Sequence, residues 1–320
     1  MRIAPSFFHR TGLGLCLLLV CALGLVPTAQ ALMLDVAAAG PRWVAVGDRG
    51  SILLSDDQGS TWQPAQVTGK QMLTAVAFVD DRRGWAAGHD AQIWATADGG
   101  QSWTLQHQDP SREAPLLDLW FWNPRLGYAI GAYGTVLATS DGGQTWMDVS
   151  ERLPNPEQLH LNAIAETADG SLFIVGERGI AFRSPDRGQT WEKLDVPYEG
   201  SLFGLLPLSQ PGGLLAFGLR GQVLRSTDAG ERWLPIEVSE DGAALEPALA
   251  GGTLAPDGSL ILVGHGGVIL HSENAGRSFQ VTRQAHRRAL SAVAANCRGE
   301  LILAGERGVR LLDIDGGAAL

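Results

Sequence analysis

The chain has 320 residues, of which 45% are hydrophobic and 18% charged, with 34 acidic against 24 basic side chains. This composition is typical of a globular protein and leaves little room for a disordered tail. The net charge of −10 argues against a general nucleic-acid binder and against docking on anionic lipid. The 41 glycines show no collagen period and indicate many tight turns.

Residues 1–31 are typical of a secretory signal peptide. Arg2 and Arg10 supply the positive region, the apolar run "LGLCLLLVCALGL" follows, and "AQA" at 29–31 fits a cleavage site. A retained membrane anchor is disfavoured because the apolar run is short for a span. We therefore expect an exported chain that begins near residue 32 and has no stable membrane insertion. Its net charge becomes −12, because the signal removes two arginines and no acid.

Six related octets divide the rest of the chain. Their final aromatic residues are 41 to 46 positions apart, which is too regular for unrelated turns. In chain order they are "SDDQGSTW" (55–62), "TADGGQSW" (96–103), "TSDGGQTW" (139–146), "SPDRGQTW" (184–191), "STDAGERW" (226–233) and "SENAGRSF" (272–279).

A second motif, close to G-x-x-G, lies upstream of each octet and occurs once more near the C-terminus. The seven copies are "GDRG" (47–50), "GHDA" (88–91), "GAYG" (131–134), "GERG" (176–179), "GLRG" (218–221), "GHGG" (264–267) and "GERG" (305–308). Short apolar runs precede and follow each copy, as "LFIV" and "TVLATS" illustrate. Such runs between Gly, Asp and Ser are strand signals, and no segment shows a sustained helical period.

Each unit therefore contains four strands, and a four-stranded repeat of this length is typical of a β-propeller blade. Seven G-x-x-G copies predict an all-β, seven-bladed propeller over residues 32–320. The last blade lacks a clear fourth strand, so we expect it either to have three strands or to form an outer strand from residues 313–320.

The octet is interpreted as a structural turn between the third and fourth strands. Its Asp can accept hydrogen bonds from the backbone of the turn, the following Gly can adopt positive φ, and the aromatic can pack into the blade. Six copies on an outer rim favour this role over catalysis. The octets also lack the alternating carboxylates of a calcium loop. The residues assigned this structural role are Asp57, Asp98, Asp141, Asp186, Asp228 and Asn274, with Trp62, Trp103, Trp146, Trp191, Trp233 and Phe279.

These octets resemble the Asp-box of the bacterial neuraminidase (BNR) repeat, S/T-x-D-x-G-x-T-W. Together with the "GERG" and "GAYG" turns, they resemble the exported photosystem II stability/assembly factor family over the whole mature chain. The resemblance implies a protein-binding propeller that holds a membrane-protein client with an arginine-rich face. A photosynthetic source would place the chain in the thylakoid lumen, and another source in the periplasm. The octet alone also occurs in sialidases and sortilin-type receptors.

The chain carries no recognisable catalytic motif. It has neither G-x-S-x-G nor H-E-x-x-H, and its histidines fall in no metal-ligand spacing. Tyr133 with Glu177 could be assigned to a sialidase mechanism, but the arginine element that precedes sialidase Asp-boxes is missing. We therefore predict a non-enzyme without metal or cofactor. Cys297, the single cysteine after residue 31, excludes a disulfide framework and is expected to be buried.

The G-x-x-G turns form the candidate site, because they join the second and third strands on the face opposite the octets. Four blades place an arginine at the third position of this turn, and one places a tyrosine. The loop that leads from the fourth strand of the sixth unit to the first strand of the seventh adds Arg287 and Arg288 on the same face. Arginine and tyrosine suit the carboxylates of a protein partner. The candidate partner-binding residues are Arg49, Tyr133, Arg178, Arg220, Arg307, Arg287 and Arg288.

Two alternatives remain open for this face. In one, the arginines bind a partner's carboxylates; in the other, Glu177 and Glu306 neutralise neighbouring arginines and the face is a self-paired rim. Asp90 and Gly266 interrupt the series of arginines. The predicted function is accordingly a monomeric scaffold or assembly factor for a membrane protein complex, with a BNR-type glycosidase and a sortilin-like peptide receptor as alternatives. Elsewhere, Trp120 and Trp122 are interpreted as core residues, and residues 237–252 as an insertion that covers one face.

Overall fold

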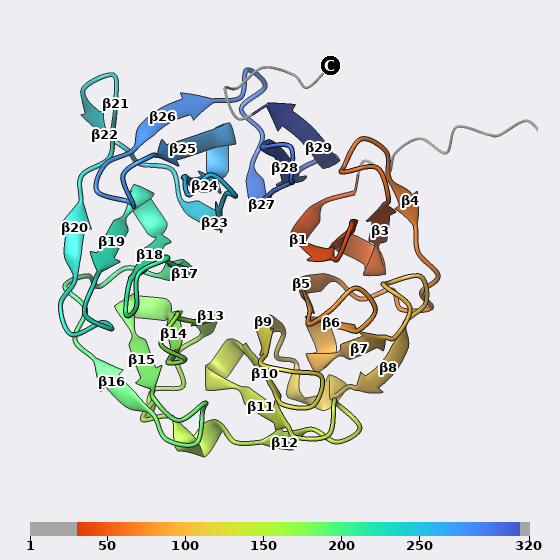
Figure 1. Cartoon of the computed structure of the whole chain (residues 1–320). Coiled ribbons are helices and arrows are strands. Elements are labelled where there is room, and N and C mark those ends of the chain that lie inside the picture. Colours follow the sequence, from red (N-terminus) through yellow and green to blue (C-terminus); the bar gives the residue numbers. More distant parts are fainter. Residues whose placement is uncertain (1–30, 314–320) are drawn as a thin grey trace, which may run out of the picture.

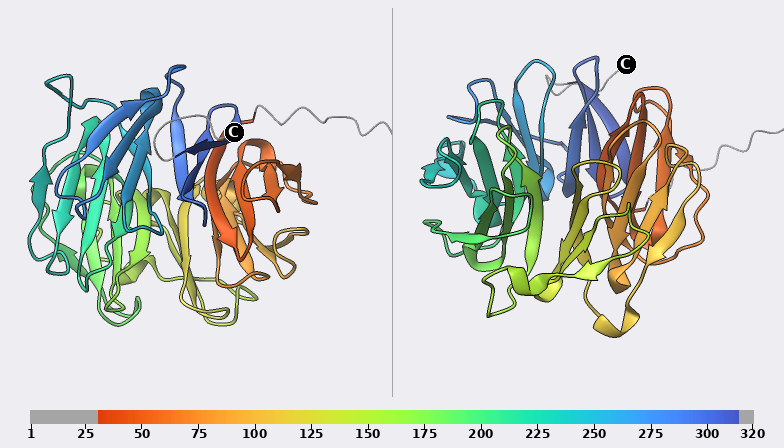
Figure 2. Two further views of the ribbon diagram at one scale, coloured as in Figure 1. Left: turned by 45° about the horizontal axis from the view of Figure 1, so that its top comes forward. Right: turned by 60° about the horizontal axis from the view of Figure 1, so that its bottom comes forward.

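The computed structural model describes residues 31–313, which form a ring of antiparallel sheets around a central channel (Figures 1 and 2). Six sheets have four strands and a seventh has three. The predicted all-β, seven-bladed propeller with a three-stranded last blade is therefore confirmed. Residues 1–30 of the predicted signal peptide and residues 314–320 of the alternative outer strand lie outside the described residues.

The strands of each blade follow chain order from the channel outwards. Blades one to three contain β1 (Met33–Ala39), β2 (Arg42–Gly47), β3 (Ile52–Ser55), β4 (Gln63–Pro64), β5 (Leu73–Phe78), β6 (Gly84–Gly88), β7 (Ile93–Thr96), β8 (Thr104–His107), β9 (Leu116–Phe121), β10 (Gly127–Gly131), β11 (Val136–Thr139) and β12 (Met147–Asp148). Blades four and five contain β13 (Leu161–Glu166), β14 (Leu172–Gly176), β15 (Ala181–Ser184), β16 (Glu192–Leu194), β17 (Leu202–Pro207), β18 (Leu214–Gly218), β19 (Val223–Ser226) and β20 (Leu234–Ile236). Blades six and seven contain β23 (Leu249–Leu254), β24 (Leu260–Gly264), β25 (Val268–Ser272), β26 (Gln280–Arg283), β27 (Leu290–Ala295), β28 (Glu300–Gly305) and β29 (Gly308–Asp313).

The core lies between the blades rather than inside any one of them. Every residue of the second strand β14 is buried, because a neighbouring blade packs on each face of its sheet. The same two-sided burial explains why the second strands read as unbroken apolar runs. Phe173, Phe182 and Phe217 are almost completely inaccessible, and each such side chain contributes about 1.5–3 kcal/mol to folding.

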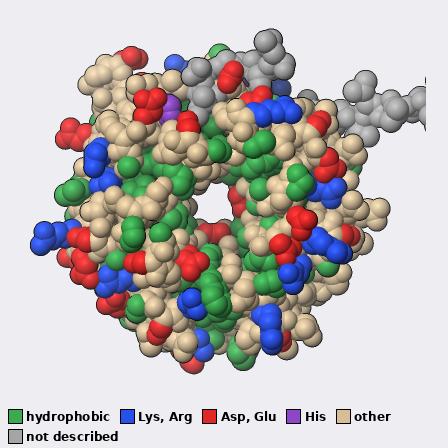
Figure 3. Space-filling model, in the orientation of Figure 1, with side chains coloured by type: hydrophobic (Ala, Val, Ile, Leu, Met, Phe, Trp, Pro, Cys, Tyr) green, Lys and Arg blue, Asp and Glu red, His purple; other side chains and the backbone are tan. Residues whose placement is uncertain are grey.

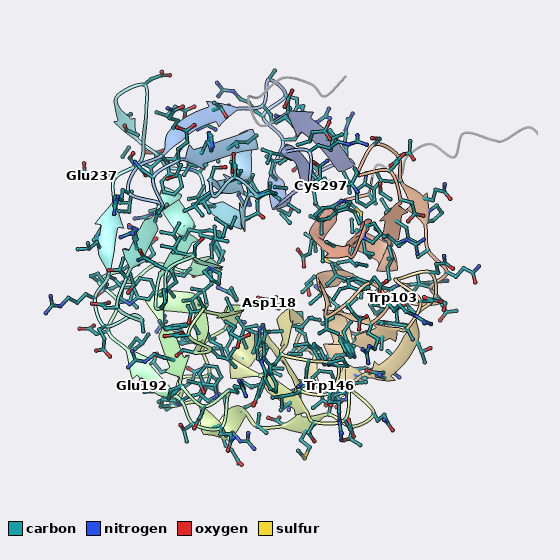
Figure 4. All side chains as sticks on the ribbon, in the orientation of Figure 1. Trp103, Asp118, Trp146, Glu192, Glu237 and Cys297 are labelled. Carbon is teal, nitrogen blue, oxygen red and sulfur yellow. The ribbon has the colours of Figure 1, made fainter. Side chains whose placement is uncertain are left out.

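The octets form compact turns on one face. In the third octet, Asp141 accepts hydrogen bonds from the Thr145 hydroxyl (2.7 Å), the Thr145 amide (2.9 Å) and the Thr139 hydroxyl (2.9 Å). These bonds, chiefly that from the Thr145 hydroxyl, hold the pKa of Asp141 down at about 2. Gly143 has φ +86°, a conformation that glycine adopts without strain. Trp103 and Trp146, labelled in Figure 4, belong to the second and third octets and lie towards the outside of the ring.

Each octet also accepts a hydrogen bond from the preceding blade, a link that the sequence did not indicate. The acceptor is the carbonyl of the fourth octet residue, whose backbone is left-handed in all six copies. Tyr128 of blade three, for example, donates to the Arg187 carbonyl of blade four at 2.9 Å. The other donor–acceptor pairs are Arg42–Gly99, Trp85–Gly142, Gln106–Gly142, Arg183–Ala229, Arg225–Ala275 and Asn296–Gln58.

The last of these links closes the ring. The fully buried Asn296 of blade seven donates to the Gln58 carbonyl of blade one at 3.0 Å. Met33 and Ile302 belong to one apolar cluster shared by the same two blades. Because β1 stays in the sheet of blade one, the described residues close the ring without exchanging a strand. Cys297 lies beside this contact and is exposed, so the expectation of a buried thiol was wrong.

Two further expectations concerned peripheral residues. Trp120 packs against the core between blades three and four, as expected, whereas Trp122 is 44% exposed. The insertion at 237–252 contains the short hairpin of β21 (Ser239–Glu240) and β22 (Ala243–Ala244), which projects from the edge of the ring (Figure 1). Glu240 of this hairpin pairs with Arg283 of β26, so the insertion is held against blade six.

Candidate functional site

The seven G-x-x-G turns surround one mouth of the channel. In blades one to six each turn contains a single 3₁₀ turn between the second and third strands, and in blade seven Gly305 and Gly308 pair directly in a tight hairpin. The 3₁₀ turns are η1 (Asp48–Gly50), η2 (His89–Ala91), η4 (Ala132–Gly134), η6 (Glu177–Gly179), η7 (Leu219–Gly221) and η8 (His265–Gly267).

The first glycine allows each turn to lie directly on the innermost strand. At Gly131, which has an extended backbone, a Cβ atom would come within 2.2 Å of the Pro115 carbonyl oxygen. The next residue, Ala132, donates its amide to that same carbonyl at 2.9 Å. The equivalent contact recurs in all seven blades. The turns are therefore fixed to the strands that line the channel, and their third residues surround its mouth.

The third residue of every turn has a left-handed backbone, with φ between +53° and +69°. Side chains at this position point outwards from a fixed loop. The Arg49 side chain is 89% exposed, that of Arg178 is 67% exposed, and Tyr133 is 59% exposed. Arg220 and Arg307 are exposed as well. We call Arg178, Arg220, Arg307 and Arg49, on blades four, five, seven and one, the basic arc.

The arginines of the basic arc differ in their charge partners. Arg178 pairs with Glu157 at 3.2 Å, and Arg49 lies 3.6 Å from the neighbouring Asp48 carboxylate. Arg220 and Arg307 have no carboxylate within 4.0 Å among residues 31–313. Glu177, expected as an arginine partner, instead accepts a hydrogen bond from the His160 amide at 3.3 Å. The self-paired rim is thus realised in part, and by Glu157 and Asp48 rather than by Glu177.

Blades two and six interrupt the series in different ways. Asp90 supplies an acidic side chain on blade two, and its carboxylate accepts a hydrogen bond from the Gln71 amide group at 2.5 Å. On blade six, the guanidinium of Arg283 donates to the Gly266 carbonyl at 3.3 Å. The backbones of Arg287 and Arg288 lie against the following Gly267, and Arg287 is exposed. The side chain of Arg283, which also pairs with Glu240, therefore contacts the turn of blade six, whose own third residue is a glycine.

Tyr133 lies next to a histidine. The ring centres of Tyr133 and His160 are 5.0 Å apart, and the Tyr133 amide donates to His160 Nδ1 at 3.4 Å. His160 Nε2 is 3.8 Å from the Glu177 carboxylate. No hydrogen bond joins Tyr133 to Glu177 in the part of the chain that the structure describes. The sialidase assignment of these two residues therefore gains no support from their geometry.

The channel wall contains two carboxyl groups that sequence reasoning missed. Asp35 and Asp118 occupy the same position in the first strands of blades one and three, and the other blades have Ala or Gly there. Among residues 31–313 they are the only ionisable side chains that line the central cavity of about 400 Å³. Figure 3 shows the hollow centre of the ring, and Figure 4 labels Asp118 at its edge.

Each channel carboxyl bridges two blades. Asp35 accepts the amides of Val36 and, across the blade boundary, Val76, both at 2.8 Å. Asp118 accepts those of Leu119 and Ile164 in the same way. Burial raises the pKa of Asp35 to about 6 and that of Asp118 to about 7, against the lowering effect of the hydrogen bonds. The Asp35 charge adds to the shift of Asp118.

The described residues offer no group of three or more His, Cys, Asp or Glu side chains that could hold a metal ion. In the same part of the chain, no helix has the length and apolar character needed to cross a membrane. The arrangement on the basic arc is instead suited to recognising carboxylates through exposed guanidinium groups.

Comparisons with known proteins agree with this architecture. Residues 105–234 match the family described as photosynthesis system II assembly factor YCF48. Two similar solved structures are YCF48 bound to D1 peptide (TM-score 0.69, 20% identity, covering 88% of this chain and 91% of that one) and YCF48 from Cyanidioschyzon merolae (TM-score 0.68, 15% identity, 88% and 95%). The WD40 propeller domain of Doa1 is also similar in fold (TM-score 0.67, 14% identity, 88% and 93%). No curated protein sequence matches the chain.

Proposed function

We propose that this chain, a BNR propeller of the photosystem II assembly factor-like family, is an exported, non-enzymatic scaffold or assembly factor for a membrane protein complex. Its client would be a membrane protein or the exported segment of one, bound by a monomeric propeller. The predicted signal peptide supports export to the periplasm, or to the thylakoid lumen in a photosynthetic source. A similar propeller, YCF48, binds a D1 peptide, which supports a polypeptide client here.

The proposal rests on the basic arc, whose arginines are exposed on turns that are fixed to the innermost strands. Four exposed arginines stand at one structural position around the channel mouth, and two of them have no carboxylate partner among residues 31–313. A free guanidinium can bind a partner carboxylate with two parallel hydrogen bonds. Leu219, which precedes Arg220 in its turn, and Phe203, which lines the central cavity, are exposed on blade five and add apolar contact area for a polypeptide. The arc therefore suits a client segment that carries both carboxylates and apolar side chains.

Glycine substitutions test the arc without disturbing its turns. Gly266 already occupies the same left-handed position in blade six. Replacing Arg by Gly there relieves about 1–2 kcal/mol of backbone strain, which offsets the roughly 0.5–1 kcal/mol of added freedom in the unfolded chain. The quadruple variant Arg49→Gly, Arg178→Gly, Arg220→Gly, Arg307→Gly is thus expected to fold with near wild-type stability.

The experiment is an affinity capture from the native exported fraction with the wild-type chain and with this variant. We expect the wild type to retain a membrane-protein client that the variant loses. Gln58→Gly, at a left-handed position on the octet face, serves as the matched control and should retain the client. Recovery of the same client by all three proteins would overturn the role of the arc. Glycan turnover by the purified chain would favour the glycosidase alternative instead.

A further inference from the structure

The face opposite the basic arc carries a second surface with features of a binding site. A cavity of about 610 Å³ opens between blades three and four on the octet side, beside β12 and the fourth octet. Its volume is within the range of ligand pockets. Tyr128 is almost fully buried in its wall, whereas Met147, Arg152 and Arg187 are exposed around it.

Side chains that usually become buried in interfaces are exposed at this cavity. Met147, on β12, is 56% exposed, and Trp122, on the turn between β9 and β10, is 44% exposed. The Arg187 guanidinium lies over the Trp122 ring, 3.6 Å from its centre. This stack connects Trp122 to the cavity, because Arg187 lines it. Tryptophan, methionine and arginine are the residues enriched at protein interfaces.

The two arginines, Arg152 and Arg187, give the cavity a positive charge that no described carboxylate neutralises. Neither Arg152 nor Arg187 has a carboxylate within 4.0 Å among the described residues. At two other blade boundaries the arginines are paired with carboxylates. Arg42 pairs with Asp56, and Arg183 pairs with Glu192 and Glu231.

The carboxylates that do line the cavity are engaged in their own turns. Asp186 accepts from Ser184, Gln189 and Thr190. Asp169 accepts from Thr167 and Ser171. Glu166, on the neighbouring strand, feels the charge of Arg187 without pairing to it.

From this geometry we propose that the cavity between blades three and four binds a polypeptide segment of a partner protein in which a carboxylate lies next to an aliphatic or aromatic side chain. The apolar side chain contacts Met147 and Trp122, and the carboxylate pairs with Arg187 and Arg152. Because this surface is on the octet face, it is separate from the basic arc and does not rest on the proposed function.

The test uses three labelled synthetic peptides and fluorescence anisotropy. One peptide alternates Glu with Leu and Phe, the second replaces Glu by Lys, and the third replaces the apolar residues by Ser. All measurements use the Arg49, Arg178, Arg220 and Arg307 glycine variant of the whole mature chain as background, so that the basic arc cannot bind the probe.

Arg187→Gly removes the guanidinium without straining the turn, because Gly99 and Gly142 occupy the same octet position in blades two and three. Met147→Ser removes the apolar contact. The matched controls are Gln58→Gly, at the same octet position of blade one, and Leu234→Ser, an exposed leucine on β20.

We expect only the acidic–apolar peptide to bind, and each cavity variant to weaken it about tenfold or more, the loss expected for an interface hot spot. The two controls should leave its affinity unchanged. Equal binding of all three peptides, an equal loss in the controls, or unchanged affinity in the Arg187→Gly, Met147→Ser double variant would each overturn the proposal. Binding of a neutral oligosaccharide in the cavity with no binding of any peptide would also overturn it.

Discussion

Replacing Asp118 by asparagine should change how the stability of the propeller depends on pH. Asp118 faces the channel and accepts the amides of Leu119 and Ile164, both at 2.8 Å. Its pKa is raised to about 7 in the folded protein, chiefly by burial, from an ordinary value of 3.8. The folded protein therefore holds this proton more tightly than the unfolded chain does. The stabilising contribution of the proton is complete below about pH 4 and is lost as pH rises towards 7.

The size of the effect follows from the shift. Raising a pKa from 3.8 to about 7 corresponds to about 4 kcal/mol over the full range, at about 1.4 kcal/mol per pH unit. About 2–3 kcal/mol of this falls between pH 5 and 8. Asparagine does not titrate, so the free energy of unfolding of Asp118→Asn should lack this decline. The wild type should lose stability relative to the variant by about this amount as the pH rises from 5 to 8.

Urea unfolding at pH 5, 6, 7 and 8, followed by tryptophan fluorescence, measures this difference. Asp241→Asn, at the exposed tip of the hairpin between β21 and β22, is the matched control, because it removes one negative charge outside the channel. Its curve should run parallel to that of the wild type. If Asp118→Asn also stays parallel to the wild type from pH 5 to 8, then Asp118 titrates near its ordinary value and the reasoning about the channel is refuted.

Substitutions at Asn296, Gly131 and Asp141 test the fold further. Asn296→Ala removes two hydrogen bonds donated by the side chain and leaves the amides of Arg298 and Glu300 without their acceptor at the ring closure. Chemical denaturation should therefore show a free energy of unfolding lower by about 2–4 kcal/mol. A decrease of less than about 1 kcal/mol would contradict the closing role of Asn296. Gly131→Ala places a Cβ atom 2.2 Å from the Pro115 carbonyl oxygen and should lower the free energy of unfolding by more than about 3 kcal/mol. In the control Gly242→Ala, the new Cβ has no atom within 4 Å, so the free energy of unfolding should fall by only about 1 kcal/mol. Equal decreases in the two variants would refute the steric argument. Asp141→Ala should have a lower melting temperature than the wild type above about pH 4, and the difference should disappear as the pH falls through about 2. Asp141→Asn should keep a melting temperature close to that of the wild type, because Asn274 performs the same role in the sixth octet. A melting temperature lower in the asparagine variant than in the alanine variant would contradict this.

The architecture could be predicted from the sequence because the blade unit repeats seven times along the chain. Strand-forming runs, G-x-x-G turns and octets repeat in one order, so the number of blades follows from counting them. The left-handed position of Arg220 and its counterparts could be aligned from the motif alone. Their placement around one mouth follows from propeller topology, and the structure adds the exposure and the charge partner of each.

Features that depend on one blade could not be predicted in this way. The position of Asp118 in the channel wall follows from a register shift between Leu116 and Asp118, which no periodicity reveals. The donors that link one blade to the next octet are of several residue types, such as Arg42, Tyr128 and Asn296, so no single motif marks them. The alternation of Trp120 and Trp122 predicts that both lie in the core, but Trp122 lies one residue beyond the end of β9, where the alternation no longer holds.

The basic arc is proposed to bind the client. The most direct test compares the affinity of a captured client for the wild type with its affinity for a variant that lacks the arc. The wild type and the quadruple glycine variant at Arg49, Arg178, Arg220 and Arg307 are compared by titration at 50 and 300 mM salt after circular dichroism and urea unfolding have shown equal folding. We predict that the variant binds at least tenfold more weakly at low salt, and that only the wild type loses much of its affinity at high salt. Equal affinities of the two folded proteins at both salt concentrations would contradict the account.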